Sequence, residues 1–591
     1  MSARLTVFPF DPVRQIGTVC EVGPSFVRAN LPKAAEPKGQ WLHGLRLPAG
    51  EVGDFVVVEL PGIAIFGRIT LVKLPERDRL TVEPGVRTQS EPHPVGTIQM
   101  LTSISLKDSE LLGGITGFPR LGAAVYSAHP DLVRWVAEVS GSKGSGDGRL
   151  TLHIATIPEA GDSPVLFTPE QILGCHCAVL GATGSGKSWT VARLVEQTAE
   201  HASKVILFDA TGEFYKLDGA IHHVHLGEDK APQPRESTEV SLPYTNFTES
   251  DLFALFRPSG QSQGPKLRAA IKSLKLIRLA PKLATNGLLR KAQQRKAPVE
   301  AAQFQQSHSL ERAGADFEID RLCQQIEEEC VYPSGGTRSA PDYSMWGDMN
   351  EAERGYCVSL INRISGILGS TELACVFKLG TVKSLFTVID EFLKDSATRV
   401  LRVSLRNLSF AFDSREIIAN AIGRQLLTRA RRGDFKEKPL FLFLDEAHQF
   451  LNKVVSDENL RHPLDSFELI AKEGRKFSLN ICIATQRPRD IPDGVLSQVG
   501  TMIVHRLTNE QDRQVVEKAS GDIDRAAAAF LPVLAPGQAV LIGAQLPIPL
   551  TVQLCRPRQP PESQGPDYQQ YWRQTQPVEE AAPISDDDVL F

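Results

Sequence analysis

The sequence predicts an α/β protein in which a parallel-sheet core is preceded by a small β-barrel and interrupted by a helical insertion. First, residues 177–200 read as an apolar strand, a glycine-rich loop and a helix, and the stretch KVILFDATGEF at 204–214 adds a second apolar strand. Strands buried on both faces of a parallel sheet read as continuous apolar runs of this kind. Second, short apolar runs alternate with Gly/Pro turns throughout residues 1–155. Third, apolar residues recur at helical spacing within residues 226–395.

Residues 1–155 form the predicted N-terminal barrel. The apolar runs FVVVEL, IAIFGRITLV and TLHIATI, at 55–60, 63–72 and 151–157, are separated by turn residues. No long helical period precedes residue 130. Short strands with regular turns are typical of a small barrel or sandwich.

The predicted core is split into residues 156–225 and 396–555. The α/β pattern resumes with VLRVSLRNL at 400–408, and a helix is expected over 414–432. Further apolar strands are expected at 439–444, 481–485 and 501–507. Strands that alternate with helices in this way predict a parallel sheet.

Residues 226–395 form the predicted helical insertion, whose most basic part runs from Lys266 to Lys296. This run holds ten Lys and Arg residues and no Asp or Glu. An acidic helical stretch at 316–330 and a Gly/Ser/Pro loop at 333–341 follow it. The basic run either contacts DNA or forms a solvated helix face that the acidic stretch balances. We favour the solvated face, because charge runs usually face solvent.

Residues 556–591 form the predicted C-terminal tail. The segment is rich in Pro and Gln and then acidic, so it lacks the apolar residues that a core requires. We expect an extended tail, within which YWRQ at 571–574 is the part suited to docking.

The composition indicates a large globular protein and excludes recognition of nucleic acid through bulk charge. The chain has 591 residues, a formal net charge of −5, 23% charged residues and 42% hydrophobic residues. Any DNA-binding surface must therefore be local. The cysteines are scattered, the start lacks the apolar core of an export signal, and no uncharged apolar run approaches about 18 residues. We therefore expect a cytoplasmic protein with no membrane span.

The stretch GATGSGKS at 181–188 matches the Walker A pattern of a P-loop and lies between an apolar strand and a helix. Its glycines let backbone N–H groups approach phosphate oxygens, and the helix N-terminus adds a positive dipole end. We expect Lys187 to contact the β- and γ-phosphates of ATP and Ser188 to bind Mg²⁺. The predicted nucleotide-binding residues are Gly181, Ala182, Thr183, Gly184, Ser185, Gly186, Lys187, Ser188 and Trp189.

Two carboxylates follow the apolar run FLFL and complete the predicted catalytic site. Asp445 stands at the carboxyl edge of the sheet, where we expect it to join Ser188 in the Mg²⁺ shell. Glu446 is suited to polarise the attacking water, so the pair describes a hydrolase. Gln486 follows the strand at 481–485 and is either a γ-phosphate sensor or an ordinary turn residue.

The letters DEAH at 445–448 do not make this chain a DEAH-box helicase. Such enzymes hydrolyse ATP between two RecA-like lobes of one chain. The segment after Gln486 is shorter than the roughly 150 residues that a second lobe needs, and the expected Q-x-x-G-R-x-G-R motif is absent from the sequence. A single-lobe ATPase core must receive its arginine finger from a neighbouring copy. Head-to-tail borrowing closes a ring, so we expect a homo-oligomer.

The arginine that acts across this interface is expected to be Arg475, on the corner before the strand at 481–485. Arg506 and Arg513 are alternatives, and Arg487 lies close enough to Gln486 to act within its own chain. For Arg475, the sequence read alone favours an ordinary surface arginine.

The motifs together resemble the HerA family of ATP-driven DNA translocases, relatives of the FtsK pumps. GATGSGKS, FDATGEF, LFLDEAHQF, EGRKFSLNICIATQRPRDIP and IVHRLTNEQD occur in order, and IGTVCEVGPSFVRANL and VGDFVVVEL resemble the family's barrel. The resemblance implies a homohexamer around duplex DNA in a central channel, with Mg-ATP as fuel. It supports Glu446, Gln486 and Arg475 in the roles above. It also implies that Asp209, Gly212 and Glu213 line the mouth of the site.

The resemblance also implies a partner that docks on the barrel face: a nuclease, or a sirtuin-like NAD-consuming effector in bacterial antiphage (antiviral) defence. DNA contacts are expected from Lys472, Lys476, Arg487 and Arg489, since a ring multiplies a few cations per subunit. The alternative function is an ATP-dependent ring scaffold that assembles or gates an effector with little DNA motion. A conjugation or protein pump ranks last, because those usually carry membrane helices.

Overall fold

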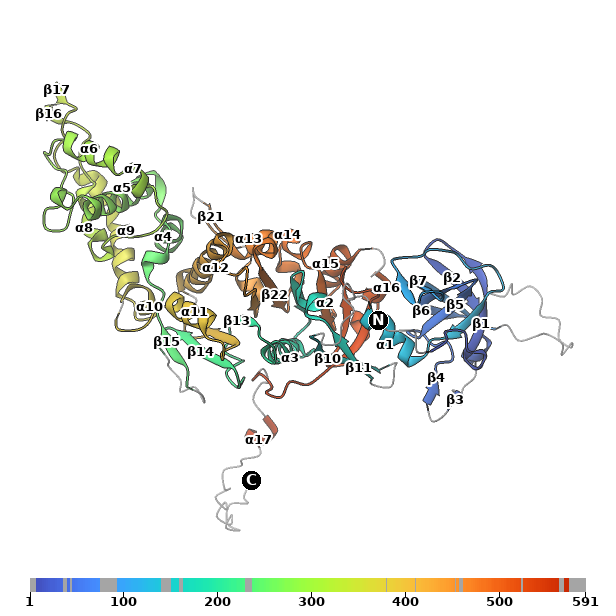
Figure 1. Ribbon diagram of the computed structural model, residues 1–591. Helices are drawn as coiled ribbons and strands as arrows, with labels where there is room; N and C mark the ends of the chain where they lie inside the picture. Colours follow the sequence, from blue (N-terminus) through green and yellow to red (C-terminus); the bar gives the residue numbers. More distant parts are fainter. Residues whose placement is uncertain are drawn as a thin grey trace, which may run out of the picture.

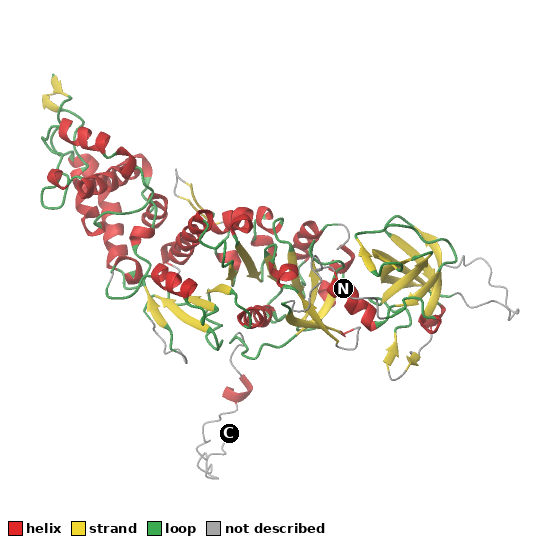
Figure 2. Cartoon of the chain, in the orientation of Figure 1, coloured by secondary structure: helices red, strands yellow, loops and turns green. Residues whose placement is uncertain are grey.

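In the computed structural model, a barrel lies at one end of a large central sheet and a helical lobe lies at the other end (Figure 1). Figure 2 shows the same division, with strands dominating the barrel and helices the opposite lobe. The structure describes residues 7–35, 40–42, 45–74, 93–139, 150–158, 163–228, 236–337, 339–378, 380–409, 411–451, 453–456, 461–521, 525–562 and 568–572.

The N-terminal sheet runs in the order β2-β1-β9-β5-β6-β7-β8, and pairing of β2 with β7 closes six of these strands into an antiparallel barrel. Alternate side chains fill its interior, among them the fully buried Val27, Ile65 and Ile98. A Cβ at Gly67 would lie 2.7 Å from the Gln99 carbonyl oxygen, so only glycine allows the shift in register between β6 and β7 there. The strands are β1 (Gln15–Val22), β2 (Phe26–Asn30), β5 (Phe55–Leu60), β6 (Ile63–Lys73), β7 (Val95–Ser105), β8 (Glu110–Leu112) and β9 (Ala124–Ser127). The predicted barrel is thereby confirmed.

The central sheet has twelve strands in the order β11-β10-β25-β24-β23-β12-β22-β19-β13-β18-β14-β15. From β23 to β15 the neighbours are parallel, and from β11 to β23 they are antiparallel. The strands are β10 (Leu152–Ile157), β11 (Ser163–Phe167), β12 (Cys177–Leu180), β13 (Lys204–Asp209), β14 (Ile221–Leu226), β15 (Thr238–Val240), β18 (Val400–Ser404), β19 (Leu440–Leu444), β22 (Leu479–Thr485), β23 (Thr501–His505), β24 (Gln538–Ile542) and β25 (Leu550–Leu554). The predicted α/β core is confirmed.

One strand was assigned to the wrong domain. The run at 151–157 was predicted to belong to the barrel, but β10 pairs with β11 and β25 in the central sheet. An isolated apolar run does not reveal its partner strand, and β25 lies almost 400 residues further along the chain. The chain crosses from barrel to core through α1 (Pro130–Val139).

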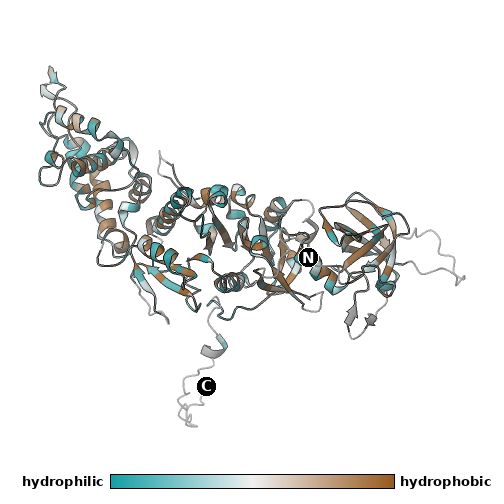
Figure 3. Cartoon of the chain, viewed as in Figure 1, coloured by the Kyte–Doolittle hydropathy of each residue, from teal (hydrophilic) through white to brown (hydrophobic). Residues whose placement is uncertain are grey.

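Both faces of the parallel sheet are buried, as its continuous apolar strands predict. Ala178 and Leu180 on β12 face one core cluster, which includes side chains of α12 (Ser414–Arg432) and α13 (Ser466–Glu473). Cys177 and Val179 face the other cluster, which includes α3 (Lys187–Ala199). Figure 1 shows α12 and α13 on one side of the sheet and α3 on the other, and Figure 3 shows the apolar residues concentrated along these strands.

The barrel is joined to the core through a buried arginine. Arg68 on β6 donates to the Thr551 hydroxyl on β25 at 2.9 Å and lies 4.3 Å from the ring centroid of Phe530. The guanidinium also donates to the Gly53 carbonyl within the barrel. This guanidinium therefore links strand β6 of the barrel to strand β25 of the central sheet.

The helical lobe is inserted between β15 and β18, at the outer edge of the sheet (Figure 1). Its predicted helical character is confirmed, although the predicted loop at 333–341 contains the hairpin strands β16 (Gly335–Thr337) and β17 (Ala340–Asp342). The helices are α4 (Glu249–Phe256), α5 (Gly260–Leu279), α6 (Ala297–Gln305), α7 (Ser307–Leu310), α8 (Leu322–Glu328), α9 (Glu351–Gly369), α10 (Ala374–Phe377) and α11 (Leu385–Lys394).

The basic run of this lobe is paired with acidic residues of the same lobe. Ion pairs join Arg278 to Asp316, at 2.8 Å, and Lys291 to Glu329. Arg290 and Glu328 are 3.6 Å apart. Three of the predicted basic side chains are thus balanced by the acidic stretch at 316–330. Arg278 and Arg290 are exposed, which agrees with the solvated-face interpretation, whereas Lys291 and Glu329 are buried together within the lobe.

The remaining elements cover the core and the start of the tail. They are α2 (Pro169–Leu173), α14 (Asp493–Leu496), α15 (Glu510–Ser520), α16 (Arg525–Ala528), α17 (Tyr568–Trp572) and the strand pairs β3 (Gln40–Leu42) with β4 (Leu45–Leu47) and β20 (Lys453–Ser456) with β21 (Arg461–Leu464). Of the predicted tail, residues 563–567 and 573–591 lie outside the described residues. None of the described helices combines the length and apolar content that crossing a bilayer requires.

Candidate functional site

The loop between β12 and α3 brings backbone N–H groups to the carboxyl edge of the sheet. Gly184 and Gly186 adopt φ angles of 75° and 111°, which favour glycine. At Gly181 a Cβ would lie 2.7 Å from the Cβ of His505, so the loop lies directly against β23. The helix α3 begins at Lys187, where the sequence predicts it. The arrangement is a P-loop, which closes around phosphate oxygens.

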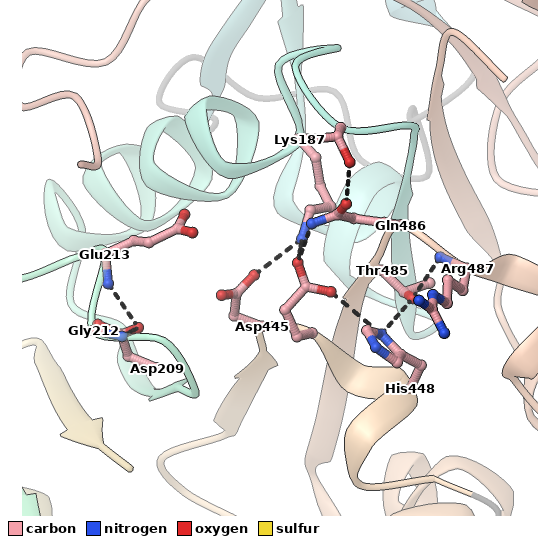
Figure 4. A network of polar contacts seen from close by, with 11 residues as sticks. Lys187, Asp209, Gly212, Glu213, Asp445, His448, Thr485, Gln486 and Arg487 are labelled. Atoms are coloured by element: carbon pink, nitrogen blue, oxygen red, sulfur yellow. Dashed lines mark hydrogen bonds and ion pairs between the residues drawn. The ribbon is translucent and has the colours of Figure 1, made fainter. Parts of the chain in front are cut away.

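Lys187 lies between the two carboxylates that follow β19. Its Nζ is 3.3 Å from Asp445 Oδ1, as Figure 4 shows, and it is 2.6 Å from Glu446 Oε1. The two acidic residues are 258 and 259 positions away in the sequence, yet all three side chains are buried. They meet because parallel strands present their carboxyl ends at one edge of the sheet.

Gln486 joins the P-loop to the second carboxylate. Its side-chain oxygen accepts a hydrogen bond from the Thr183 hydroxyl at 2.5 Å, and its Nε2 donates to Glu446 Oε1 at 2.7 Å. His448, which the sequence analysis did not single out, lies 3.2 Å from Glu446 Oε2 and 3.2 Å from the Thr485 hydroxyl. An amide that contacts both the phosphate loop and a carboxylate can sense the terminal phosphate.

The charges of the site are set by burial and by these contacts. Burial raises the pKa of Asp445 to about 7, and the charge of Lys187 opposes that rise. Burial also acts to raise the pKa of Glu446, but the bonds from His448 and Gln486 and the charge of Lys187 outweigh it and lower the pKa to about 2. Glu446 is therefore ionised at neutral pH.

The oxygen atoms of the site fit a magnesium ion. Asp445 is 1% exposed, and its Oδ2 has no hydrogen-bond partner among the described residues. Burying a carboxylate oxygen without a partner destabilises the folded protein unless a cation binds to that oxygen. Ser188 stands one residue after Lys187 in the first turn of α3. Carboxylate and hydroxyl oxygens are ligands that Mg²⁺ accepts, so Ser188 and Asp445 would hold the ion.

The other predicted nucleotide-binding residues lie on the same loop. The Ala182 N–H donates to the Arg506 carbonyl at 3.1 Å, and the Gly537 N–H donates to the Ser185 carbonyl at 3.1 Å. These bonds anchor the loop to the segments around β23 and β24. Trp189, in the first turn of α3, is half-buried, and its contact with nucleotide stays a prediction.

Arg475 lies far from the P-loop of its own chain. It sits in the turn that precedes β22, at the amino edge of the sheet, whereas the P-loop lies at the carboxyl edge. The arginine is exposed and lines a cavity of about 290 Å³. The lining residues are Gly174, Pro439, Leu440, Phe441, Arg475, Ser478 and Asn480. The structure therefore does not bring Arg475 to the site within one chain.

The predicted DNA contacts are also divided between the two edges of the sheet. Lys472 and Lys476 lie before β22, and Lys472 pairs with Glu468 at 2.6 Å. Arg487 and Arg489 follow β22 at the other edge. The four cations do not form one patch on a single subunit.

One residue implied to line the mouth of the site has a different place. Asp209 is fully buried and accepts hydrogen bonds from the backbone of Gly212, Glu213 and Phe214. It also pairs with the fully buried Arg402 at 2.7 Å. Asp209 therefore shapes the loop after β13 and does not face the nucleotide. A carboxylate at the end of an apolar strand has the same sequence pattern in both roles.

His505 forms the floor of the P-loop and was missed by the sequence analysis. Its Nδ1 lies 2.9 Å from the Gln538 carbonyl, which fixes the proton on that nitrogen, so Nε2 accepts from the Thr190 hydroxyl at 2.8 Å. The available signal was a polar residue at the end of the apolar strand 501–505, next to the P-loop strand. Burial lowers the pKa of His505 to about 4.

Replacing His505 with glutamine is expected to reduce the amount of folding stability that the protein loses at acidic pH. An unfolded histidine has a pKa near 6.5, so below that pH the unfolded chain binds a proton that the folded chain excludes. The contribution of neutral His505 to the free energy of unfolding is fully present above about pH 6.5. It is lost as the pH falls toward 4, by up to about 3 kcal/mol. His176 is buried with a similarly lowered pKa of about 4, so the variant should keep part of the acid sensitivity.

The measurement is the midpoint of thermal unfolding between pH 7.5 and about 4. Wild type should lose more of its midpoint over this range than His505→Gln does. Equal losses in both proteins would contradict the assignment of His505 as a neutral, buried group.

Two family models match the chain. The model described as "Helicase HerA, central domain" matches residues 152–321, and "Helicase HerA-like C-terminal" matches residues 426–532. These segments include the P-loop and the strand β22 with its flanking turns. The second segment also holds Asp445, Glu446 and Gln486.

Curated relatives and solved structures are similar to the chain over most of its length. The DNA double-strand break repair helicase HerA of Saccharolobus solfataricus is 26% identical over 379 residues, which is 64% of this chain and 64% of the relative, less than two thirds. A probable helicase of Methanocaldococcus jannaschii is 24% identical over 86% of each chain. The plasmid coupling protein TrwB with a GTP analogue matches with a TM-score of 0.39 and 16% identity, covering 68% of this chain and 90% of TrwB. VirB4 of Thermoanaerobacter pseudethanolicus matches with a TM-score of 0.40 and 13% identity, covering 72% of this chain and all of VirB4.

Proposed function

The chain belongs to the HerA family, and on that premise we propose that it is a Mg²⁺-dependent ATPase that forms a hexameric ring and moves duplex DNA through the ring. The observation that carries the proposal is the contact set joining Lys187, Glu446 and Gln486. It supplies a cation for phosphate, a carboxylate for the attacking water and an amide that contacts both. Hydrolysis requires this full set, whereas nucleotide binding alone does not.

The ring is supported by the position of Arg475. Phosphoryl transfer needs a cation beside the γ-phosphate, and this arginine stands at the opposite edge of the sheet from its own P-loop. When identical subunits pack head to tail, the amino edge of one sheet meets the carboxyl edge of the next, and the repeat closes into a ring. Each nucleotide then lies at an interface and is completed by the neighbour's arginine.

Duplex DNA is the proposed substrate of the motor. The curated relatives named as DNA repair helicases support it. The repetition of each subunit's cations around a ring supports it as well. The chain has a net charge of −5, but a few exposed cations per subunit, repeated around a central channel, make a basic bore. Lys472, Lys476, Arg487 and Arg489 stay the proposed contacts.

We also propose that the barrel face holds a partner effector, either a nuclease or an NAD-consuming enzyme. The barrel unit exposes large apolar side chains to a degree that favours a docking role, with Phe118 55% and Leu121 69% exposed. An antiviral role would follow from such an effector.

The test is the ATPase rate of the purified ring with and without duplex DNA, alone and with the product of the neighbouring gene. We expect DNA to raise the rate severalfold, and we expect the stimulation to fall steeply with salt because phosphate contacts release counterions. A rate that is unaffected by DNA in every combination would overturn the motor and favour the alternative, an ATP-gated scaffold for an effector.

A further inference from the structure

One ring nitrogen of His448 faces two acceptors at the same distance. Nδ1 lies 3.2 Å from Glu446 Oε2, and it lies 3.2 Å from the Thr485 hydroxyl oxygen, as Figure 4 shows. An ionised carboxylate can only accept, so this nitrogen carries a hydrogen and donates it. A single hydrogen cannot point straight at both oxygens. It is therefore directed either at the carboxylate or at the hydroxyl.

The backbone at Glu446 brings the imidazole to this place. Glu446 has a φ angle of 48°, in the left-handed region that residues with a Cβ rarely adopt. The short helix Ala447–Gln449 follows, and the Gln449 N–H donates to the Glu446 carbonyl at 2.9 Å. This tight turn places the side chain of His448 back beside the carboxylate that is proposed to activate water.

The other acceptor, Thr485, is held between the P-loop and the turn that leaves β22. Thr485 is fully buried, and its carbonyl accepts a hydrogen bond from the Gly181 N–H at 3.3 Å. Its hydroxyl oxygen accepts from the Arg487 N–H at 3.0 Å (Figure 4). Arg487 and Arg489 are exposed on that turn. The hydroxyl oxygen therefore contacts both His448 and the turn that carries two of the proposed DNA contacts.

We infer that His448 is a positioning residue that links DNA contact at this turn to the catalytic carboxylate, through Thr485. While the His448 hydrogen is directed at Glu446, the carboxylate is stabilised and is a weaker base for water. When the hydrogen is directed at Thr485, Glu446 is released to accept a proton.

DNA contact selects between the two arrangements through the backbone of the turn. A phosphate bound by Arg487 and Arg489 draws the Arg487 N–H away from the Thr485 hydroxyl oxygen. That oxygen then accepts from His448, and Glu446 is released. The inference rests on the proposed function, because it names the route by which DNA stimulates hydrolysis at the same site.

The test is the ratio of ATPase rates with and without duplex DNA for Thr485→Val, which keeps the shape of the side chain and removes the hydroxyl. We expect DNA to raise the rate of this variant by less than about twofold, against severalfold in wild type, because a residue that carries the coupling has been removed. Thr485→Ser keeps the hydroxyl and should retain most of the stimulation. Affinity for a labelled duplex should be unchanged in both variants, since Arg487 and Arg489 remain.

Two further variants complete the design. His448→Leu removes the shared hydrogen at a side chain that is 20% exposed, so it gives the same readout if Thr485→Val fails to fold. Its DNA stimulation should also be lost, and the double variant should lose no more than either single variant. Thr102→Val removes a buried hydroxyl from the barrel, where it donates to the Leu112 carbonyl. This matched control should keep the stimulation of wild type.

The outcomes separate the link from the motor. Severalfold stimulation in Thr485→Val or in His448→Leu would overturn the link and leave the proposed motor in place. Loss of stimulation in Thr485→Ser as well as in Thr485→Val would also overturn the link, because the hydroxyl would not be the cause. A wild-type rate that does not respond to DNA would overturn both the link and the motor.

Discussion

Replacing Glu446 with glutamine is expected to lower the rate of ATP hydrolysis by about 10²- to 10⁴-fold and to leave nucleotide binding in place. The low pKa of Glu446, about 2, is maintained by His448, Lys187 and Gln486 against the effect of burial. When Lys187 instead contacts phosphate, the carboxylate loses its closest cation and becomes a stronger base for water. A glutamine at position 446 can still accept the hydrogen bond from Gln486, but it cannot accept a proton from the attacking water.

The measurement is phosphate release under saturating Mg-ATP, together with binding of a fluorescent ATP analogue. Glu300→Gln, far away in the helical lobe, controls for the loss of a carboxylate. A variant that still hydrolyses ATP within a few-fold of wild type would show that another group activates the water. If Glu446→Gln no longer moved DNA but still assembled and regulated an effector, the scaffold hypothesis would explain the assembly and regulation of that effector.

Replacing Arg475 with alanine is expected to lower hydrolysis by on the order of 10³-fold, because the γ-phosphate would lose the cation supplied by the neighbouring subunit. Arg475 is exposed at the amino edge of the sheet, so its removal should not disturb the fold of its own chain. Arg513→Ala, an alternative finger whose Nη1 donates to the Thr508 carbonyl, is the matched control and should keep most of the activity.

Mixing the two inactive variants distinguishes action across an interface from action within a chain. In a mixed ring, some interfaces join the intact catalytic carboxylate of an Arg475→Ala subunit to the intact arginine of a Glu446→Gln subunit. These interfaces should restore measurable hydrolysis, although each variant alone is inactive. A mixed ring without any recovery, or a monomer as active as the ring, would contradict the shared site.

Local chemistry explains which parts of the site were predictable from the sequence. The P-loop, the strand before Asp445 and the helix over 414–432 follow from residues that are neighbours in the chain, and the structure has that helix at Ser414–Arg432. The approach of Lys187 to Glu446 also follows, because carboxyl ends of parallel strands share one edge of the sheet.

Contacts that depend on strand order or on side-chain direction were not predictable. β10 joins the core through β25, which no local pattern can reveal. Asp209 ends an apolar strand as Asp445 does, but it turns toward Arg402 and its own loop. His505 carries a function only because β23 lies next to the P-loop strand, a neighbour relation absent from its sequence.

The barrel and the helical lobe occupy opposite ends of the central sheet (Figure 1). A macromolecule held by one end leaves the other end open, so two different binding events on a subunit need not compete for space. Changes of sequence in the lobe can therefore leave both the barrel face and the P-loop between the two ends unaltered.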